Sequence, residues 1–294
     1  MKLKRFKYSP ILGWSVSRYE VFQTCKRRYF YNYYAKYDSE FTREQIDFLK
    51  KLTTVPLEVG NIVHDIHKKL LERLQKTTQT LDSKRFDEYI YKLTKEYCEN
   101  KTFAEIYYHQ QTQIKINEIY EQVRFCVQNF LQSERFHWLF DKAIARSSEW
   151  LVEPDGYGET RINDLKAYCK VDFLFPVGDD DCYILDWKTG KPDKAKHAKQ
   201  LAGYATWASY HFDAKPENIK SLVCYLSPEY TEVPVTVTEA DIIHFAEQVK
   251  IETEEMYQHC TFVQENIPTI KSTFTLTENT KLCEYCNFRE LCGR

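Results

Sequence analysis

Residues 166–190 read KAYCKVDFLFPVGDDDCYILDWKTG, and this stretch decides the fold. Two runs rich in apolar and aromatic residues flank a glycine and three aspartates at 178–181, a composition typical of a tight turn. The stretch therefore predicts an antiparallel hairpin. Pairing that is symmetric about Asp179 places Asp172 opposite Asp186.

The hairpin gathers charged groups that suit a hydrolytic metal site. Side chains alternate along a strand, so Asp186 and Lys188 share one face, and Asp172 joins them across the ladder. Two facing carboxylates repel, and a divalent cation such as Mg²⁺ between them relieves that repulsion. The nearby lysine can position a water or stabilise a charged transition state. On spacing alone, an ordinary ion pair on a solvated strand remains an equal alternative.

The hairpin lies in the second half of the chain, where strands alternate with helices, whereas the first half is mainly helical. Helices are expected at 15–36 with a break near residue 25, from residue 60 to about 75, and at 84–102, 105–134, 193–212 and 239–262. Strands are expected at 149–154, 166–175, 182–188 and 220–226. The strand, helix and strand between 182 and 226 require a crossover, and so at least one parallel pair. We expect one α/β domain, residues 1–294, with a helical insertion at about 75–145.

Composition excludes several classes of protein. The chain has 294 residues, of which 43% are hydrophobic and 29% charged, as in a globular protein. Its net charge of -2 gives no overall attraction to nucleic acid or anionic lipid, so contact with a polyanion needs a local basic groove. No apolar run is long enough to span a membrane. The basic start is followed by Tyr8, Ser9 and Pro10 rather than by an apolar run, so export is not expected and the cytoplasm is.

Three of the ten cysteines have the spacing of metal ligands. Cys283, Cys286 and Cys292 form a C-x₂-C-x₅-C pattern, which suits a tetrahedral metal or one edge of an iron–sulfur cluster. The other cysteines lie singly in apolar or helical patterns. A fourth ligand must therefore come from elsewhere, and the spacing by itself favours zinc.

The hairpin motif resembles a known family. Asp172, followed 14 residues later by Asp186-Trp187-Lys188-Thr189-Gly190, is similar to the core motif of the PD-(D/E)XK nuclease superfamily, and above all to its RecB-type branch. The resemblance implies a restriction-endonuclease-like core, with a central mixed sheet flanked by helices, and metal-dependent phosphodiester hydrolysis. It also implies that Asp172, Asp186 and the carbonyl of Trp187 bind the metal, and that Lys188 orients or activates water.

Two further motifs match the same branch. Gly60 and His64 resemble its G-x-x-x-H motif, which implies that His64 is a metal ligand. A helical wheel places His67 inside the apolar stripe of this helix and His64 at its edge, free to point toward the carboxylates. Gln200 and Tyr204 match the Q-x-x-x-Y motif, which implies contact with the substrate, and their spacing puts both on one helical face.

The preceding strand offers two more carboxylates, Glu149 and Glu153. Either lies near enough in sequence to assist a second metal, but no motif assigns a role to one of them.

The segment around Cys25, from Ser17 to Phe30, resembles the opening of the iron–sulfur members of this branch, such as the AddB nuclease domain. That resemblance implies a cysteine clasp, in which Cys25, Cys283, Cys286 and Cys292 hold a [4Fe–4S] cluster. Zn²⁺ is the alternative occupant. Joining these positions closes a loop of about 260 residues, which strongly restricts the unfolded chain.

Together these patterns predict a RecB-type nuclease that uses Mg²⁺ or Mn²⁺ to cleave DNA, single strands in particular, as an exonuclease rather than an endonuclease. DNA repair, recombination or CRISPR adaptation is the expected setting. The sequence has no G-x-x-x-x-G-K-[ST] phosphate loop, so ATP-driven unwinding would need a partner, either a helicase or a CRISPR-adaptation protein. Two alternatives stay open: a non-catalytic DNA-binding or assembly subunit, and a zinc-stapled interaction protein.

Overall fold

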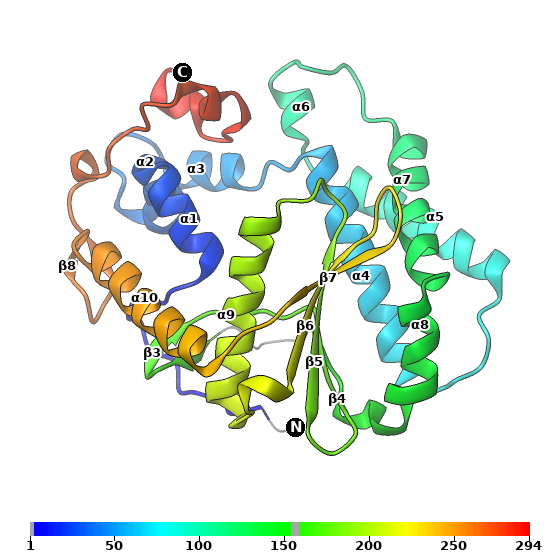
Figure 1. The fold of residues 1–294 in the computed structure, drawn as a ribbon. Helices are drawn as coiled ribbons and strands as arrows, with labels where there is room; N and C mark the ends of the chain where they lie inside the picture. The colour runs from blue at the N-terminus through cyan, green and yellow to red at the C-terminus, as the bar shows by residue number, and fades with distance from the viewer. Residues whose placement is uncertain (1–2, 154–158) are drawn as a thin grey trace.

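The computed structural model describes residues 3–153 and 159–294. The first two residues of the basic start, and Pro154 at the end of the strand expected at 149–154, lie outside these ranges. A five-stranded sheet of order β1-β4-β5-β6-β7 forms the centre of the fold (Figure 1). Its strands are β1 (Leu151–Val152), β4 (Phe173–Val177), β5 (Asp181–Lys188), β6 (Ile219–Tyr225) and β7 (Thr231–Val235). Two small sheets pair β2 (Thr160–Ile162) with β3 (Leu165–Ala167), and β8 (Cys260–Phe262) with β9 (Ile267–Pro268).

The hairpin of β4 and β5 has the expected register. Phe173 lies opposite Leu185, and Val177 lies opposite Asp181, so the pairing is symmetric about residue 179. β5 and β6 are parallel, and the other pairs of this sheet are antiparallel. The expected crossover and the mixed sheet are therefore confirmed.

The single strand expected at 166–175 is wrong. Residues 165–167 form β3 in a separate hairpin, and β4 begins only at Phe173. The reason is a pairing with the N-terminal segment: Trp14 N donates to Lys166 O (2.9 Å), and Tyr168 N donates to Trp14 O (2.7 Å). A local sequence pattern does not contain this partner, since it lies more than a hundred residues away.

Ten α-helices are present in the described ranges: α1 (Val16–Thr24), α2 (Lys26–Tyr34), α3 (Arg43–Lys50), α4 (Val55–Leu74), α5 (Ser83–Glu99), α6 (Ala104–Tyr107), α7 (Ile116–Leu131), α8 (Glu134–Trp138), α9 (Lys194–Phe212) and α10 (Glu239–Tyr257). The break near Cys25 is confirmed. α4 starts before Gly60, because Thr54 caps it, accepting from Leu57 N, and Pro56 occupies its first turn. The single helix expected at 105–134 is wrong: α6 ends at Tyr107 and α7 begins at Ile116. No helix in the described ranges has the length and apolar character needed to cross a membrane.

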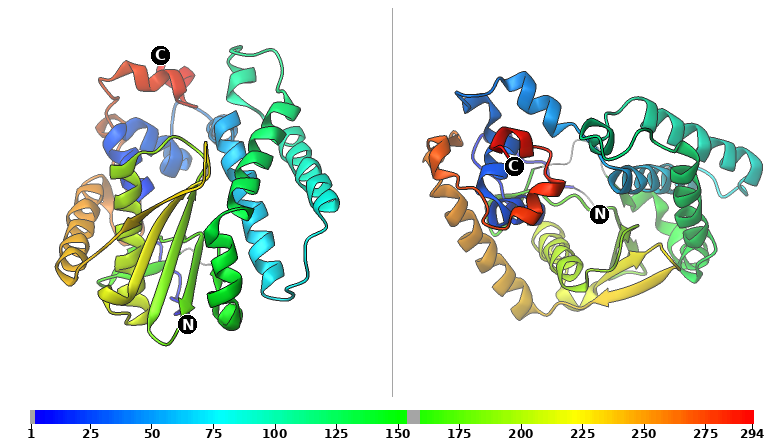
Figure 2. Two further views of the ribbon diagram at one scale, coloured as in Figure 1. Left: turned by 45° about the vertical axis from the view of Figure 1, so that its right-hand side comes forward. Right: turned by 90° about the horizontal axis from the view of Figure 1, so that it is seen from above.

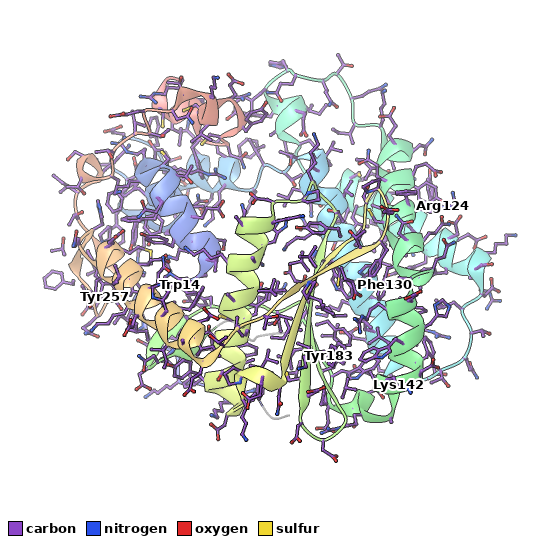
Figure 3. The ribbon with its side chains drawn as sticks, viewed as in Figure 1. Trp14, Arg124, Phe130, Lys142, Tyr183 and Tyr257 are labelled. Atoms are coloured by element: carbon purple, nitrogen blue, oxygen red, sulfur yellow. The ribbon has the colours of Figure 1, made fainter. Side chains whose placement is uncertain are left out.

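Alternate residues of the sheet enter two separate cores, one on each face. Leu174 and Ile184 pack in the core that α9 covers, whereas Leu185 and Trp187 pack in the core of α4 and α7. Figure 2 shows these helices on opposite sides of the sheet. Because the period is two, Asp186 belongs to the face of α9. Buried side chains fill both sides of the sheet, as Figure 3 shows, and this explains the nearly continuous apolar runs of β4 and β5.

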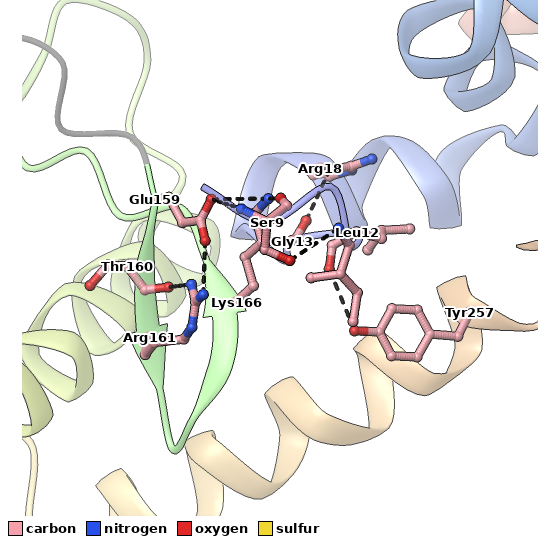
Figure 4. A network of polar contacts seen from close by, with 10 residues as sticks. Ser9, Leu12, Gly13, Arg18, Glu159, Thr160, Arg161, Lys166 and Tyr257 are labelled. Atoms are coloured by element: carbon pink, nitrogen blue, oxygen red, sulfur yellow. Dashed lines mark hydrogen bonds and ion pairs between the residues drawn. The ribbon is translucent and has the colours of Figure 1, made fainter. Parts of the chain in front are cut away.

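The N-terminal segment is tied to the hairpin of β2 and β3 by a polar network (Figure 4). The buried Lys166 ammonium pairs with Glu159 (3.1 Å) and also donates to the carbonyl of Ser9. The buried Arg18 donates to Gly13 O (3.1 Å). These bonds hold residues 9–18 against the hairpin of β2 and β3.

One buried histidine on α9 makes stability sensitive to acid. His211 accepts a hydrogen bond at Nε2 from Lys4 N (2.8 Å). Burial, and then the charge of Lys4, lower the pKa of His211 to about 4. As the pH falls, His211 therefore takes up a proton in the unfolded chain at a higher pH than in the folded protein, and this favours unfolding.

We predict that the melting temperature falls between pH 7 and pH 5, and that His211→Gln reduces this fall. His244→Gln, at an exposed position of α10, should leave it unchanged; an equal effect of both variants would contradict the assignment.

Candidate active site

The three residues of the hairpin motif meet where β4 begins and β5 ends. Asp172 directly precedes β4, and its Oδ2 accepts a hydrogen bond from Trp187 N (2.9 Å). Asp186 and Lys188 lie two residues apart near the end of β5, on the face of α9. The symmetric register thus places the two carboxylates on facing strands, as expected from the sequence.

The lysine is held in place by groups from β5 and α9. Lys188 Nζ lies 2.6 Å from Asp186 Oδ2 and donates to Gln200 Oε1 (3.0 Å). Gln200 in turn donates through Nε2 to the hydroxyl of Tyr204 (2.7 Å). The expected helical face of Gln200 and Tyr204 therefore does point into this site. The amide orients the ammonium, and the phenol orients the amide.

Burial makes it unfavourable for both carboxylates of the acid pair to be ionised. Asp186 is fully buried, and burial followed by the charge of Asp172 raises its pKa to about 7. For Asp172, burial opposes ionisation, but His64, Lys188 and the Trp187 amide hold its pKa below the usual value. Within residues 3–153 and 159–294, no hydrogen-bond donor reaches Asp186 Oδ1. A buried carboxylate oxygen that lacks a donor is typical of a cation ligand.

His64 reaches the carboxylates from α4. Its Nδ1 lies 3.4 Å from Asp172 Oδ1, and its Nε2 lies 3.2 Å from the carbonyl oxygen of Trp187. Burial opposes the charge of the imidazolium, but Asp172 and Glu153 raise the pKa of His64 to about 10. His67 is fully buried, with its ring 5.0 Å from that of Trp187. As the helical wheel predicted, His67 is the packed histidine and His64 is the one that faces the carboxylates.

Glu153 joins this group, although no motif assigned it. Its Oε1 lies 3.5 Å from His64 Nδ1, and ligand atoms of His64, Glu153 and Asp172 all lie within 4.8 Å of one another. Because Val152 pairs with Phe173, Glu153 comes opposite Asp172. The feature that identifies Glu153 as a member of the site is thus the pairing register of β1 with β4. Glu149, by contrast, pairs with Arg146 (2.7 Å) before β1 begins.

The residues present fit a divalent cation. Carboxylate and carbonyl oxygens with one imidazole nitrogen suit Mg²⁺ or Mn²⁺, and the acid pair lacks a full set of neutralising partners. A cavity of about 540 Å³ opens over these residues. Lys68, Lys101 and Lys170 line it. Acidic groups at the base of a lysine-lined cavity suit a phosphodiester substrate, since the lysines attract the phosphate and a cation bridges it to the acids.

The structure also brings both ends of the expected clasp together. Cys25 separates α1 from α2, and the C-terminal segment lies over α2 (Figure 1). The rings of Tyr31 and Phe288 are 5.3 Å apart. Burial, followed by Cys286, Cys25 and Cys283, raises the pKa of the Cys292 thiol to about 11. Arg27 N also donates to Thr275 O (3.0 Å), so the segment that follows Cys25 is in contact with the C-terminal segment.

Comparison with known proteins identifies the family. No curated protein sequence matches the chain. Chains of solved structures do match, among them one titled "Crystal structure of SSO0001", which is 16% identical, covers 70% of this chain and 94% of that chain, and has a TM-score of 0.31. A family model described as the PD-(D/E)XK nuclease superfamily matches residues 13–293. This range contains the whole central sheet and all the site residues described above, and the chain therefore belongs to the PD-(D/E)XK nuclease superfamily, whose members are typically metal-dependent nucleases.

Proposed function

We propose that this chain is a Mg²⁺- or Mn²⁺-dependent deoxyribonuclease. One observation carries the proposal: buried Asp186 faces Asp172 across the hairpin, while Gln200 and Asp186 hold Lys188 beside them. Membership of a nuclease family gives this geometry its chemistry. The intact set of two acids and a lysine argues against the alternative of a non-catalytic DNA-binding or assembly subunit.

The proposal assigns a role to each group in the site. The carboxylates of Asp172 and Asp186, the imidazole of His64 and the carbonyl of Trp187 hold the cation, and Glu153 completes the set. When bound, the cation neutralises phosphate charge and lowers the pKa of water. Lys188 orients the attacking water and stabilises the negative charge that develops on the phosphate.

Gln200 fixes the direction of Lys188, and Tyr204 fixes that of Gln200. In this proposal both residues also face the backbone of the substrate.

We also propose that the clasp of Cys25, Cys283, Cys286 and Cys292 binds a [4Fe–4S] cluster with a structural role. The packing of the C-terminal segment on α2 supports it, because the residues that follow Cys25 contact that segment: Arg27 N donates to Thr275 O (3.0 Å). Zn²⁺ is the alternative occupant, since four thiolates suit it equally well.

The proposed substrate is single-stranded DNA, cleaved from an end, in DNA repair, recombination or CRISPR adaptation. A helicase or CRISPR-adaptation partner would supply the single strand, and the cytoplasm is the proposed compartment. The lysine-lined cavity supports an anionic substrate of this kind.

The first prediction from the proposed function tests the activity itself. Wild-type protein should degrade end-labelled single-stranded DNA with Mn²⁺ or Mg²⁺, and not in chelator. Asp186→Asn should reduce the rate on the order of a hundredfold or more, because the charge that binds the cation is removed. Glu149→Gln, which changes a carboxylate outside the site, is the matched control and should cleave normally. Equal rates for wild type and Asp186→Asn would refute the proposed site.

The second prediction tests Glu153 as a ligand. Titration calorimetry with Mn²⁺ should show an affinity at least about tenfold lower for Glu153→Gln than for wild type, a loss of about 1.4 kcal/mol. The amide keeps the shape of the side chain but loses its charge. Glu149→Gln should bind Mn²⁺ like wild type. If Glu153→Gln also binds normally, Glu153 is not part of the cation site.

The third prediction distinguishes the two clasp occupants. Protein purified without oxygen should be brown, with broad visible absorbance and iron and sulfide in equal amounts, and Cys286→Ser should lose the colour and melt at a lower temperature. Cys98→Ala, in α5, is the matched control and should keep the colour. Colourless protein that contains one zinc per chain would establish the alternative.

A further inference from the structure

A second cavity, of about 290 Å³, adjoins the proposed active site. Lys170 lines both cavities, and its ammonium pairs with Glu153 (2.9 Å). Gln200 lines the second cavity and accepts from Lys188 in the first (3.0 Å). A group that occupies the second cavity therefore lies one side chain away from the groups that act on the phosphate.

An exposed aromatic ring forms one wall of this second cavity. Tyr168 is 36% exposed, and its backbone N–H donates to Trp14 O (2.7 Å). The ring lies over Gly13: a Cβ added at Gly13 would come within 2.5 Å of Tyr168 Cε2. Because Gly13 has no side chain, the Tyr168 ring can lie against it, and the hydrogen bond to Trp14 fixes the backbone of Tyr168.

The rest of the lining combines apolar residues with polar and charged ones. Val16 and Gly203 contribute apolar surface, and an added Cβ at Gly203 would be 3.6 Å from Val16 Cγ2. Lys196 pairs with Glu20 (2.7 Å), and both residues line the cavity. Aromatic and apolar side chains beside polar ones suit a planar ring that carries hydrogen-bonding groups on its edges.

We infer that this cavity binds one unpaired base of the strand, in the nucleotide next to the phosphate that is cleaved. The inference rests on the proposed nuclease function and adds a reason for single-strand preference. The volume is small for a ligand site and leaves room for one base. A base that stacks on Tyr168 must first leave its complementary base, which a single strand allows without cost. Every base has a flat face, so the cavity does not select a sequence.

Equilibrium binding tests this inference independently of cleavage. A fluorescent single-stranded oligothymidine is titrated with protein in Ca²⁺, and compared with an oligonucleotide of the same length built from abasic nucleotides, which has the same phosphates. Wild type should bind the oligothymidine more tightly. Tyr168→Ala should weaken that binding about tenfold and leave abasic binding unchanged, because only stacking is lost. Tyr168→Phe keeps the ring and should bind like wild type.

Each contrary outcome is informative. If Tyr168→Ala weakens binding of both oligonucleotides equally, or of neither, the base cavity is refuted. Melting temperatures of the two variants report any loss of fold. If wild type cleaves the oligothymidine and the abasic oligonucleotide equally well, the base cavity is refuted, but the proposed nuclease function is not. Binding that depends on bases and on Tyr168, without cleavage, would support the cavity and refute the nuclease.

Discussion

The repulsion between two buried carboxylates is the constraint on which the rest of this structure depends. Asp172 and Asp186 face each other across a hairpin that is covered on both sides; Asp186 is fully buried and only Asp172 borders the cavity, so water screens the pair poorly. Neighbouring groups offset this repulsion: Lys188 pairs with Asp186, while His64 and the backbone N–H of Trp187 contact the carboxylate of Asp172. These compensations are incomplete, because the pKa of Asp186 remains raised to about 7. The buried acid pair lowers the stability of the fold, and a cation bound between the two carboxylates would restore it.

The two cores of the sheet explain how groups from distant parts of the chain meet at this pair. Trp187 turns its ring into the core of α4, and this same contact brings His64 over the strand ends, since His67 packs against the ring. On the other face, α9 lies against β5 and β6 and presents Gln200 to Lys188. The polar site thus depends on apolar packing on both sides. A change in either core moves one half of the site relative to the other.

The sequence predicted the parts of the site that follow from local periodicity. Pairing symmetric about residue 179, and the choice of His64 over His67, depend only on strand alternation and helical spacing. Glu153 was a candidate together with Glu149, and the sequence did not choose between them, because the choice depends on how β1 pairs with β4, which no local pattern encodes. The break after β3 was missed for the same reason: its partner is Trp14. Long-range pairings are therefore what sequence reasoning lacked, in the fold and in the site alike.

The N-terminal segment connects the two proposals that lie outside the acid pair. Gly13 makes room for the aromatic wall of the base cavity, and the next residues open α1, which Ser15 caps. Helix α1 ends at Cys25, the N-terminal ligand of the proposed clasp. A nine-residue helix transmits displacement of one end to the other because its hydrogen bonds keep it straight. In the two proposals α1 is thus the element that the clasp and the base cavity share, since Val16 at its start lines the cavity and Cys25 directly follows its end.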